Sequence, residues 1–363
     1  MMLLMACAEP ASTVAEVAPP WAEPDAPGPY AAGVTTLFFE SEAGKFLVAE
    51  LWYPAAPTDA PPDPYPELPL SREAHRDVDP DRSGAPYPLV AFSHGYAGIR
   101  YQSPFLTEYL AQHGYVVVAV DHVGNTFLDV GDRSELEVLM DRPSDVVASV
   151  DEVFARNLDD PQLKGLVEGG RYGMTGHSFG AFTTLAVAGG QVDLDGFVSW
   201  CAEHDATFCD SAASLPPGSV LPGSPDPRAV VAVPMSPGGW YGFGEGGSGL
   251  STLAPSLFWA GADDPITTYD EEIHPAWLAA ASPKMEATLA GAGHYIFSDI
   301  CSLAPFFSDE CDEGAGWLTT EVGHPPVQAL TTAWLDVHLR GDLRAEPWLD
   351  PARWASPMSV VAR

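Results

Sequence analysis

The amino-acid sequence predicts an α/β fold, with a doubly wound, mostly parallel sheet and helices on both of its faces. From Gly33 onward, short apolar segments alternate with segments whose apolar residues recur at helical spacing. Two of the apolar segments, 87–95 and 115–121, are almost continuously apolar, which is typical of strands buried on both faces. The hydrophobic content of 46% over 363 residues is sufficient for one large core. We therefore expect one domain over residues 33–345.

The individual elements are predicted in chain order. Segment 46–54 alternates apolar and polar residues and ends at Pro54, which indicates an edge strand; the Pro- and Asp-rich segment 55–86 predicts a surface loop. The pair Ser103-Pro104 is typical of the start of a helix. Further strands are expected at 115–121, 171–176, 229–235, 256–261 and 284–291. Further helices are expected at 144–158, after Ser178 as far as Ala188, at 275–281 and at 327–339.

Both ends of the chain differ in composition from the predicted domain. Residues 1–7 are too short for a complete secretory signal, but Leu4-Met5-Ala6-Cys7 resembles the lipobox of bacterial lipoproteins, whose cysteine is lipidated after cleavage. Residues 8–32 are rich in Ala and Pro, as in a linker between a lipid anchor and a domain. We expect an extracytoplasmic protein, either a bacterial lipoprotein with a membrane tether at Cys7 or a secreted protein; the alternative is a chance cysteine. Residues 346–363 are expected to form a C-terminal tail.

The charge of the chain restricts its partners. Asp and Glu number 50 against 16 Lys and Arg, which gives a formal net charge of −34. This charge excludes nucleic acid and an anionic membrane surface as partners, because both would repel the protein. We expect a soluble, self-repelling monomer, and binding of a basic partner is the alternative reading of the acidity.

Four of the five cysteines form two local groups in the sequence. Cys201 and Cys209 lie in a segment, about 190–227, that we expect to be an insertion, and Cys301 and Cys311 follow later. Four cysteines allow three connectivities, of which local pairing is the most economical. Disulfides would fit an oxidising compartment outside the cytoplasm. A zinc site is not expected, because no CxxC motif or Cys/His cluster accompanies the cysteines.

The pattern Gly176-His177-Ser178-Phe179-Gly180 marks a candidate nucleophile. A G-x-S-x-G pattern is weak by itself in a chain with 34 glycines, where a Gly-Ser loop is the simpler explanation. Here it lies between a predicted strand and a predicted helix, where the nucleophile elbow of a serine hydrolase belongs. Glycines two residues before and after the serine let strand and helix approach closely. We therefore predict Ser178 as the nucleophile.

A serine nucleophile needs a base and an acid that orients the base, and in this architecture they follow in the order Ser, Asp or Glu, His. Asp263 and Asp264 follow the strand at 256–261, and His294 follows the strand at 284–291. Both positions lie at the carboxyl edge of the predicted sheet, where open α/β sheets place their sites. We predict His294 as the general base and Asp264 as the acid, with Asp263 as the alternative.

Two backbone N–H groups are expected to stabilise the oxyanion of an acyl-transfer reaction. One belongs to Phe179, the residue after the nucleophile, and the other to the loop after the strand at 87–95, where Tyr96 is the best placed residue. The Tyr96 ring would also contact the substrate. His94 is expected to brace this loop and His177 to pack away from the nucleophile, rather than to act in catalysis.

The Gly-rich segment 235–249 follows a strand on the same edge of the sheet. It contains aromatic residues, including Trp240 and Tyr241, that would form a substrate-binding wall. The alternative is a flexible loop with incidental aromatic residues.

Five motifs together resemble a known family. "LWYPA", "YPLVAFSHG", "YGMTGHSFGA", "GADDPIT" and "GAGH" are similar, in this order, to the α/β-hydrolase-fold serine esterases of the dienelactone-hydrolase-like and platelet-activating-factor-acetylhydrolase-like group, near cutinase-type polyester hydrolases. The resemblance covers about residues 33–340. It implies an α/β-hydrolase fold and a triad of Ser178, His294 and Asp264 without a metal or another cofactor.

Two departures from the family patterns refine this expectation. Dienelactone hydrolases use a cysteine nucleophile where this chain has Ser178, so their substrate is disfavoured. Mammalian-type acetylhydrolases carry the acid after the preceding strand, which here ends "VPMSPGG" without a carboxylate, so the resemblance favours Asp264. The insertion at 190–227 departs from compact cutinases and would shape or cap the cleft.

These features together predict an enzyme, a serine carboxylic-ester hydrolase that works through an acyl-enzyme. Its expected substrates are short-acyl or aryl esters, with polyesters among the candidates. A phospholipid deacylase of the acetylhydrolase type is the first alternative. An acyltransferase and a non-catalytic binding protein on the same fold are the others.

Overall fold

The structure, a computed structural model, describes residues 20–62, 65, 73–204, 209, 215–303, 308–311 and 316–363. The lipobox-like Cys7 and the first part of the predicted linker lie outside the described residues. The described chain is built around one sheet whose strands lie side by side in the order β10-β9-β8-β7-β6-β4-β5-β2-β1-β3. The pairs from β5 through β4, β6, β7 and β8 to β9 are all parallel, and β1, β2 and β10 add antiparallel pairs at the two sides.

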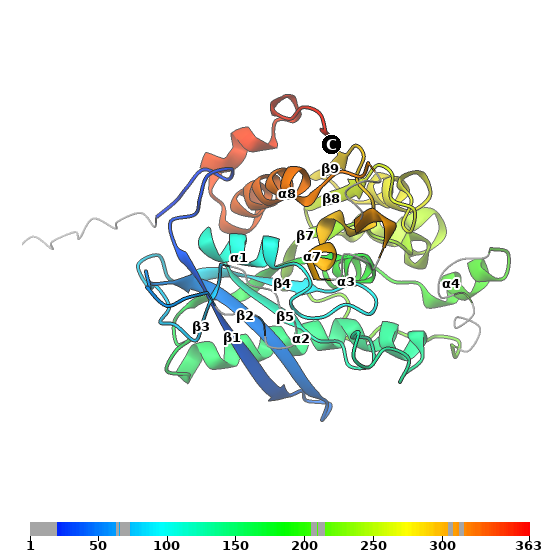
Figure 1. Cartoon of the computed structure of the whole chain (residues 1–363). Coiled ribbons are helices and arrows are strands. Elements are labelled where there is room, and N and C mark those ends of the chain that lie inside the picture. The colour runs from blue at the N-terminus through cyan, green and yellow to red at the C-terminus, as the bar shows by residue number, and fades with distance from the viewer. Residues whose placement is uncertain are drawn as a thin grey trace, which may run out of the picture.

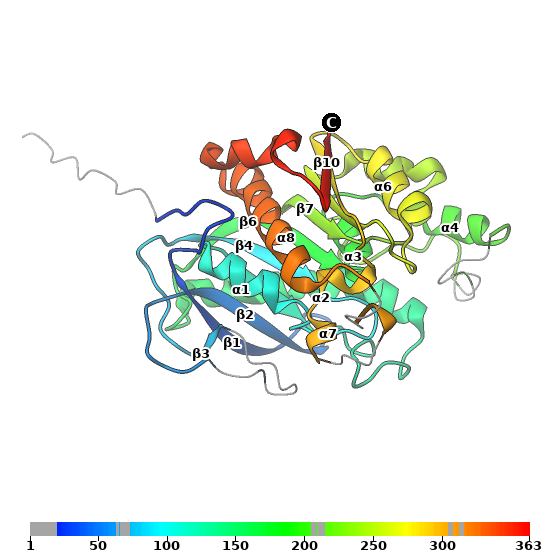
Figure 2. The same ribbon diagram turned by 45° about the horizontal axis from the view of Figure 1, so that its top comes forward.

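The strands are coloured by their position in the chain in Figure 1, and Figure 2 also labels β6 and β10. Their bounds are β1 (Ala31–Glu40), β2 (Phe46–Ala55), β3 (His75–Arg76), β4 (Tyr87–Ser93), β5 (Val116–Val120), β6 (Val167–His177), β7 (Ala229–Met235), β8 (Ser256–Gly261), β9 (Lys284–Leu289) and β10 (Met358–Ala362). The mostly parallel, doubly wound sheet predicted from the sequence is therefore confirmed.

Helices cover both faces of the sheet, as predicted. On one face lie α1 (Pro104–Gln112) and α8 (Thr320–Leu335), which run beside each other in Figure 2. On the other face lie α2 (Glu135–Asp159), α3 (Phe179–Val187) and α6 (His274–Ala279). In the described chain, two shorter helices complete the set: α4 (Leu194–Cys201) follows α3 in the chain, and α7 (Ile300–Leu303) follows β9 and the helical turn after it. Short helical turns occupy Trp240–Phe243, Glu245–Thr252, Tyr269–Ile273, His294–Phe297, Asp309–Cys311, Asp336–Arg340, Leu343–Leu349 and Pro351–Arg353.

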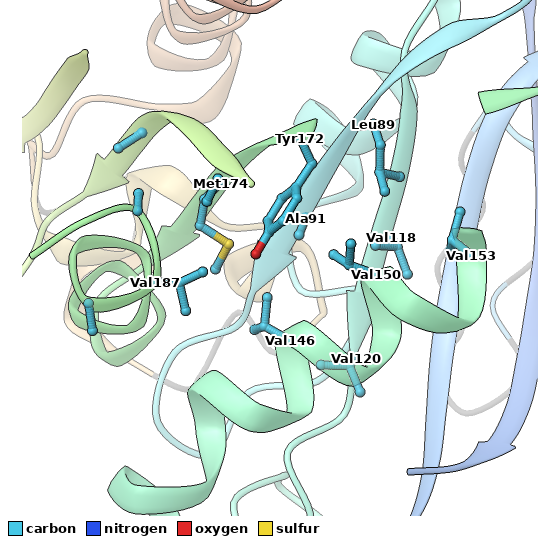
Figure 3. Packing of buried hydrophobic residues seen from close by; sticks show 14 of the residues in the cluster. Leu89, Ala91, Val118, Val120, Val146, Val150, Val153, Tyr172, Met174 and Val187 are labelled. Atoms are coloured by element: carbon cyan, nitrogen blue, oxygen red, sulfur yellow. The ribbon is translucent and has the colours of Figure 1, made fainter. Parts of the chain in front are cut away.

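The continuous apolar strands divide their side chains between two cores. In β5, Val118 and Val120 pack on the α2 side, where Val146 and Val150 of α2 face them in Figure 3. The intervening Val117 belongs to the core under α1 and α8. Because successive side chains of a strand point to opposite faces, a strand covered by helices on both faces has to be apolar throughout.

The strand at 46–54 was predicted at an edge, and this prediction is wrong. β2 lies inside the sheet, between β1 and β5. The proline at its end is tolerated because pairing with β5 covers only residues 49–52, so Pro54 lies beyond the part of β2 that is bonded on both sides.

Two predicted helices begin earlier than expected. The helix predicted from 144 begins at Glu135 and contains Pro143; a capping box between Ser134 and Glu137 fixes its first turn. Burial of Arg142 and of neighbouring apolar side chains holds this first part against the sheet. The helix predicted from 327 likewise begins at Thr320.

Segments outside the predicted domain limits contribute to the same fold. Trp21 lies in the predicted linker, and its indole N–H donates to the carboxylate of Asp336 at 3.2 Å. The centroids of the Trp21 and Trp348 rings are 6.4 Å apart, in an edge-to-face arrangement. Within the predicted tail, residues 358–362 form β10, which pairs antiparallel with β9. Both segments are therefore packed on the domain.

Both predicted local disulfides are present, Cys201–Cys209 and Cys301–Cys311. Disulfides persist in oxidising compartments, so the two bridges fit a location outside the cytoplasm. Within the described ranges, no helix has the length and apolarity that crossing a membrane requires.

Candidate active site

Ser178 lies on a sharp turn between β6 and α3. Its φ angle is +57°, in the left-handed region that residues other than glycine rarely adopt. The flanking glycines are required by close packing, because a Cβ atom on Gly180 would collide with the carbonyl oxygen of Ser93 and one on Gly176 with the backbone of Gly180. The sequence therefore folds here into the predicted nucleophile elbow, with the side chain of Ser178 on the wall of a cavity.

The predicted base and acid are in contact. His294 follows β9 and Asp264 follows β8, and the Nδ1 atom of His294 lies 2.8 Å from Oδ2 of Asp264. Both residues are buried, and His294 lines the same cavity as Ser178. The neighbouring Asp263 is exposed, and its backbone N–H donates to Ala292. Of the two adjacent aspartates, the structure places Asp264 beside the histidine.

Four further donors surround the carboxylate of Asp264. Oδ2 accepts from the hydroxyls of Ser236, at 2.8 Å, and Thr267, at 2.9 Å, while Oδ1 accepts from the N–H groups of Ile266 and Thr267. Burial raises the pKa of Asp264, but the hydrogen bond to His294 and these donors outweigh burial and hold the pKa below its ordinary value. A carboxylate at Oδ2 keeps the proton of His294 on Nδ1, so Nε2 presents a lone pair.

Ser236 and Thr267 were not found from the sequence. Thr267 is the third residue after Asp264, and a backbone N–H that returns to an aspartate two or three residues earlier is a recognisable turn pattern. Ser236 follows β7 directly, in the segment "VPMSPGG", which contains no carboxylate. Its contact with Asp264 spans 28 residues and no local pattern indicates it.

The two predicted oxyanion donors lie on the cavity wall with Ser178. Phe179 is the first residue of α3, where N–H groups point along the helix axis and favour negative charge. Tyr96 lies in the loop after β4, and its ring centroid is 6.4 Å from that of Phe179. Burial, with a hydrogen bond to the carboxylate of Glu135, raises the pKa of the Tyr96 hydroxyl.

The loop that carries Tyr96 is braced from below by buried polar groups. His94 bonds the carbonyl of Gly95 through Nδ1 at 2.7 Å and accepts the N–H of His122 at Nε2. Burial and the charge of nearby groups lower the pKa of His94, so its ring is neutral. The guanidinium of Arg142 is fully buried, donates to the carbonyl of His94 and lies 4.5 Å from the centre of the Phe179 ring. His94 thus braces the loop, as predicted.

The cavity beside Ser178 has a volume of about 700 Å³. The predicted insertion contributes Val192, Leu194 and Phe197 to its wall, and the Gly-rich segment after β7 contributes Tyr241. Among the described residues that line it, the charged side chains apart from histidine are the carboxylates Glu135 and Glu272. The wall formed by the described residues is therefore mostly apolar, with hydroxyl, amide, imidazole and carboxylate groups as its polar part.

The two aromatic residues predicted for the substrate wall differ in position. Tyr241 lines the cavity, and its ring stacks on that of Trp200 with the centroids 3.9 Å apart. Trp240 does not line the cavity, because its indole N–H is turned to the carbonyl of Glu271 at 2.7 Å. Of these two residues, the structure places Tyr241 on the cavity wall, whereas a substrate contact of Trp240 stays a prediction.

The described residues include no group of three or more His, Cys, Asp or Glu side chains that could hold a metal ion. The polar atoms around Ser178 are instead paired with one another, through Asp264 and His294 and through the neighbouring hydroxyls.

Comparisons with known proteins agree with this fold. Residues 71–127 match the model of the family "Platelet-activating factor acetylhydrolase, isoform II". Cutinase 2 from Thermobifida cellulosilytica is 31% identical over 113 residues, which are 31% of this chain and 38% of the relative. A platelet-activating factor acetylhydrolase from Cavia porcellus is 30% identical over 142 residues, 29% of this chain and 33% of the relative. The chain thus matches little more than a third of the length of these curated relatives.

A solved structure extends the likeness over nearly the whole chain. A ferulic acid esterase from Streptomyces cinnamoneus superposes with a TM-score of 0.62 and 22% identity, covering 93% of this chain and 99% of the esterase. This similarity shows the fold, which is that of the α/β-hydrolases, as the sequence motifs implied. Within that fold, the matched segments of the chain are similar to cutinases and to platelet-activating factor acetylhydrolases.

Proposed function

We propose that the protein is a serine carboxylic-ester hydrolase. The observation that carries the proposal is the 2.8 Å contact between His294 Nδ1 and buried Asp264, beside a cavity that also holds Ser178 on a strained turn. A base held by a buried carboxylate next to a serine on an elbow is the arrangement that activates a hydroxyl for acyl transfer. The esterases among the relatives support the same reaction class.

The proposed reaction has two halves. In the first, Oγ of Ser178 attacks the ester carbonyl while Nε2 of His294 takes the hydroxyl proton. The tetrahedral oxyanion is stabilised by the N–H groups of Tyr96 and Phe179, and it collapses as His294 protonates the departing alcohol. In the second half, His294 takes a proton from water, the water oxygen attacks the acyl-enzyme, and the acid leaves as Ser178 regains its proton. Asp264 stays ionised throughout and stabilises the imidazolium.

The substrates that fit best are uncharged esters with short acyl or aryl groups, including polyester chain ends. The cavity volume of about 700 Å³ and its aromatic side chains suit aryl groups. Among the described lining residues, the charged groups other than histidine are carboxylates, which would repel anionic substrates. The cutinases and the ferulic acid esterase among the similar proteins favour this choice by their names.

A phospholipid deacylase is the second candidate, because the matching family model and one curated relative are platelet-activating factor acetylhydrolases. Turnover of p-nitrophenyl esters of increasing chain length, an aromatic polyester film and a short-chain phospholipid separates the two candidates. Turnover of the phospholipid well above that of the aryl esters would select the deacylase.

The reaction class is tested by Ser178→Ala. We expect the rate of p-nitrophenyl acetate hydrolysis to fall by about 10⁴-fold or more, since the nucleophile is lost. Ser251→Ala, which changes an exposed serine that does not line the cavity, is the matched control and should retain the wild-type rate. A Ser178→Ala protein with the wild-type rate would refute the proposal.

We further propose that the mature protein is a monomer outside the cytoplasm, secreted or tethered through a lipid on Cys7. The two disulfides support the compartment, and the net charge of −34 opposes self-association. Radiolabelled palmitate incorporated by the full chain and lost in Cys7→Ser would support the tether, and sedimentation analysis tests the monomer.

A further inference from the structure

One glutamine, Gln102, connects the three loops that carry the proposed site. Its Oε1 accepts the backbone N–H of Gly95 at 2.8 Å, in the loop of the oxyanion donor Tyr96. Its Nε2 lies 3.0 Å from Nδ1 of His177, the residue before the nucleophile. Nε2 of His177 in turn lies 2.9 Å from the backbone carbonyl of His294. A single chain of hydrogen bonds therefore runs from the oxyanion loop, past the nucleophile, to the base.

The two ends of this chain fix the direction of every bond in it. The N–H of Gly95 can only donate, so Gln102 must turn its oxygen toward it and its NH₂ group toward His177. The carbonyl of His294 can only accept, so His177 must carry its proton on Nε2 and accept from Gln102 at Nδ1. A glutamine and a neutral Nε2–H histidine satisfy all three contacts at once. No other protonation state of His177 does so.

The neutral state of His177 matters for the neighbouring base. The two imidazole rings are 4.6 Å apart, and His177 is almost fully buried. Burial, together with the positive charge that His294 can carry, lowers the pKa of His177 to about 3. A charged ring at this distance would oppose the imidazolium that His294 must form during the reaction.

The backbone around Gln102 strengthens the same connection. The carbonyl of Gln102 accepts the N–H of Asp299 at 2.9 Å, and the hydroxyl of Ser103 donates to the carbonyl of Phe297 at 2.9 Å. The carboxylate of Asp299 accepts the N–H of Phe105 at 2.8 Å, at the start of α1. The segment before α1 is therefore fastened to the loop of His294, and the Gln102 side chain extends this fastening to the oxyanion loop.

We infer that Gln102, through a neutral His177, is a positioning residue that sets the oxyanion loop against the base, so that Tyr96 and His294 engage the same reacting carbonyl. This inference rests on the proposed ester hydrolysis and adds a determinant of its rate. A displacement of about 1 Å in reacting groups costs on the order of 10²-fold in rate. Cutting the chain of hydrogen bonds therefore affects kcat, while substrate binding in the apolar cavity is largely retained.

A double-mutant cycle tests the inference with Gln102→Leu, His177→Phe and the double variant. We expect each single variant to lower kcat for p-nitrophenyl acetate by about 10- to 100-fold with KM changed less than about threefold. Both substitutions cut the same chain of hydrogen bonds. The kcat of the double variant should therefore fall no further than that of the single variant with the larger loss. Losses that multiply in the double variant, or a single variant with the wild-type kcat, would overturn the inference.

Gln328→Leu is the matched control. The side chain of Gln328 donates to the carbonyl of Phe105 at 2.7 Å, so it also binds α1 but takes no part in the chain of hydrogen bonds. We expect its kcat and KM to equal those of the wild type. A loss equal to that of Gln102→Leu would mean that general weakening of α1 explains both effects, and would overturn the specific role.

A readout without substrate separates this inference from the proposed function. In ¹⁵N-labelled protein near neutral pH, the NMR signals of His177 should be those of the neutral Nε2–H tautomer. The side chain of the isosteric Gln102→Glu variant cannot donate to Nδ1 of His177, so we expect His177 to gain a proton on Nδ1. This variant also provides the test if Gln102→Leu fails to fold. An unchanged neutral His177 in Gln102→Glu would refute the inference. Absence of esterase activity in the wild type would refute the proposed function and leave the NMR result standing.

Discussion

Asp264→Asn is the substitution whose effect follows most directly from the site. The amide has the size of the carboxylate but replaces one oxygen by a donor. Two backbone N–H groups, of Ile266 and Thr267, point at Oδ1 and cannot turn, whereas the hydroxyls of Ser236 and Thr267 at Oδ2 can rotate and accept. The asparagine must therefore direct its oxygen to the backbone and its NH₂ group to His294.

This orientation reverses the tautomer of the base. With a donor 2.8 Å from Nδ1, His294 accepts there and carries its proton on Nε2, so it cannot take the proton of Ser178. In serine hydrolases the corresponding change of tautomer lowers kcat by about 10⁴-fold, or ~5.4 kcal/mol of transition-state stabilisation. We expect a loss of this size, with the fold retained because the two hydrogens of the amide serve His294 and Ser236, while the Thr267 hydroxyl donates to the carbonyl of Ser236 at 3.1 Å.

The assay is the steady-state kcat for p-nitrophenyl acetate, with circular dichroism to verify folding. Asp263→Asn is the control, since Asp263 is exposed and adjacent in sequence; its kcat should stay within about twofold of the wild type, as for most surface substitutions. A folded Asp264→Asn protein with kcat reduced less than tenfold would refute the assignment of the acid. A large loss in Asp263→Asn would transfer the role to that residue.

Three further predictions concern the surroundings of the site. Burial raises the pKa of Glu272 from 4.5 to about 7, so the folded state binds the proton of this carboxyl more tightly than the unfolded state does. Protonation of Glu272 therefore adds at most about 3 kcal/mol to the free energy of unfolding. This contribution is complete below about pH 4.5 and is lost as the pH rises through 7. Glu272→Gln should therefore have a higher Tm than the wild type at pH 8, and equal Tm values would contradict this. Tyr241→Ala removes a stacked wall of the cavity and should raise KM for aryl esters about tenfold, but hardly that for ethyl acetate; equal changes for both esters would argue against a contact with the aryl group. Replacing Cys301 and Cys311 by Ser opens a bridge of sequence separation 10 and should cost about 2–3 kcal/mol, seen as a lower Tm under non-reducing conditions, whereas an unchanged Tm would show the bridge to be dispensable.

Much of the fold was predictable because the central strands carry their own pattern. The continuous apolar runs of β4 and β5 follow from burial on both faces, and the glycines around Ser178 follow from the close approach of β6 and α3. The start of α2 was missed because Pro143 resembles a helix boundary. The capping box of Ser134 and Glu137 indicated the true start.

The parts of the site that escaped prediction depend on contacts between distant segments. Gln102 meets its partners only after α1, the oxyanion loop and the end of β6 come together, and neither neighbour in sequence indicates this. Trp240 and Tyr241 are adjacent and chemically alike, so the sequence could not tell which ring faces the cavity. The backbone turn that holds them directs one to the cavity and the other to Glu271.

Ser236 has a consequence for how such enzymes diverge. It stands at the end of β7 with its hydroxyl 2.8 Å from the carboxylate oxygen that orients the base, so the ends of two neighbouring strands reach one point in space. Two single substitutions, one at the position of Ser236 and one at that of Asp264, could move the acid from the end of one strand to the end of the next. Whichever substitution came first, the intermediate could keep a polar side chain at both positions. Lineages with the acid on different strands can thus share a continuous history, and the strand that bears the acid is a poor marker of separate descent.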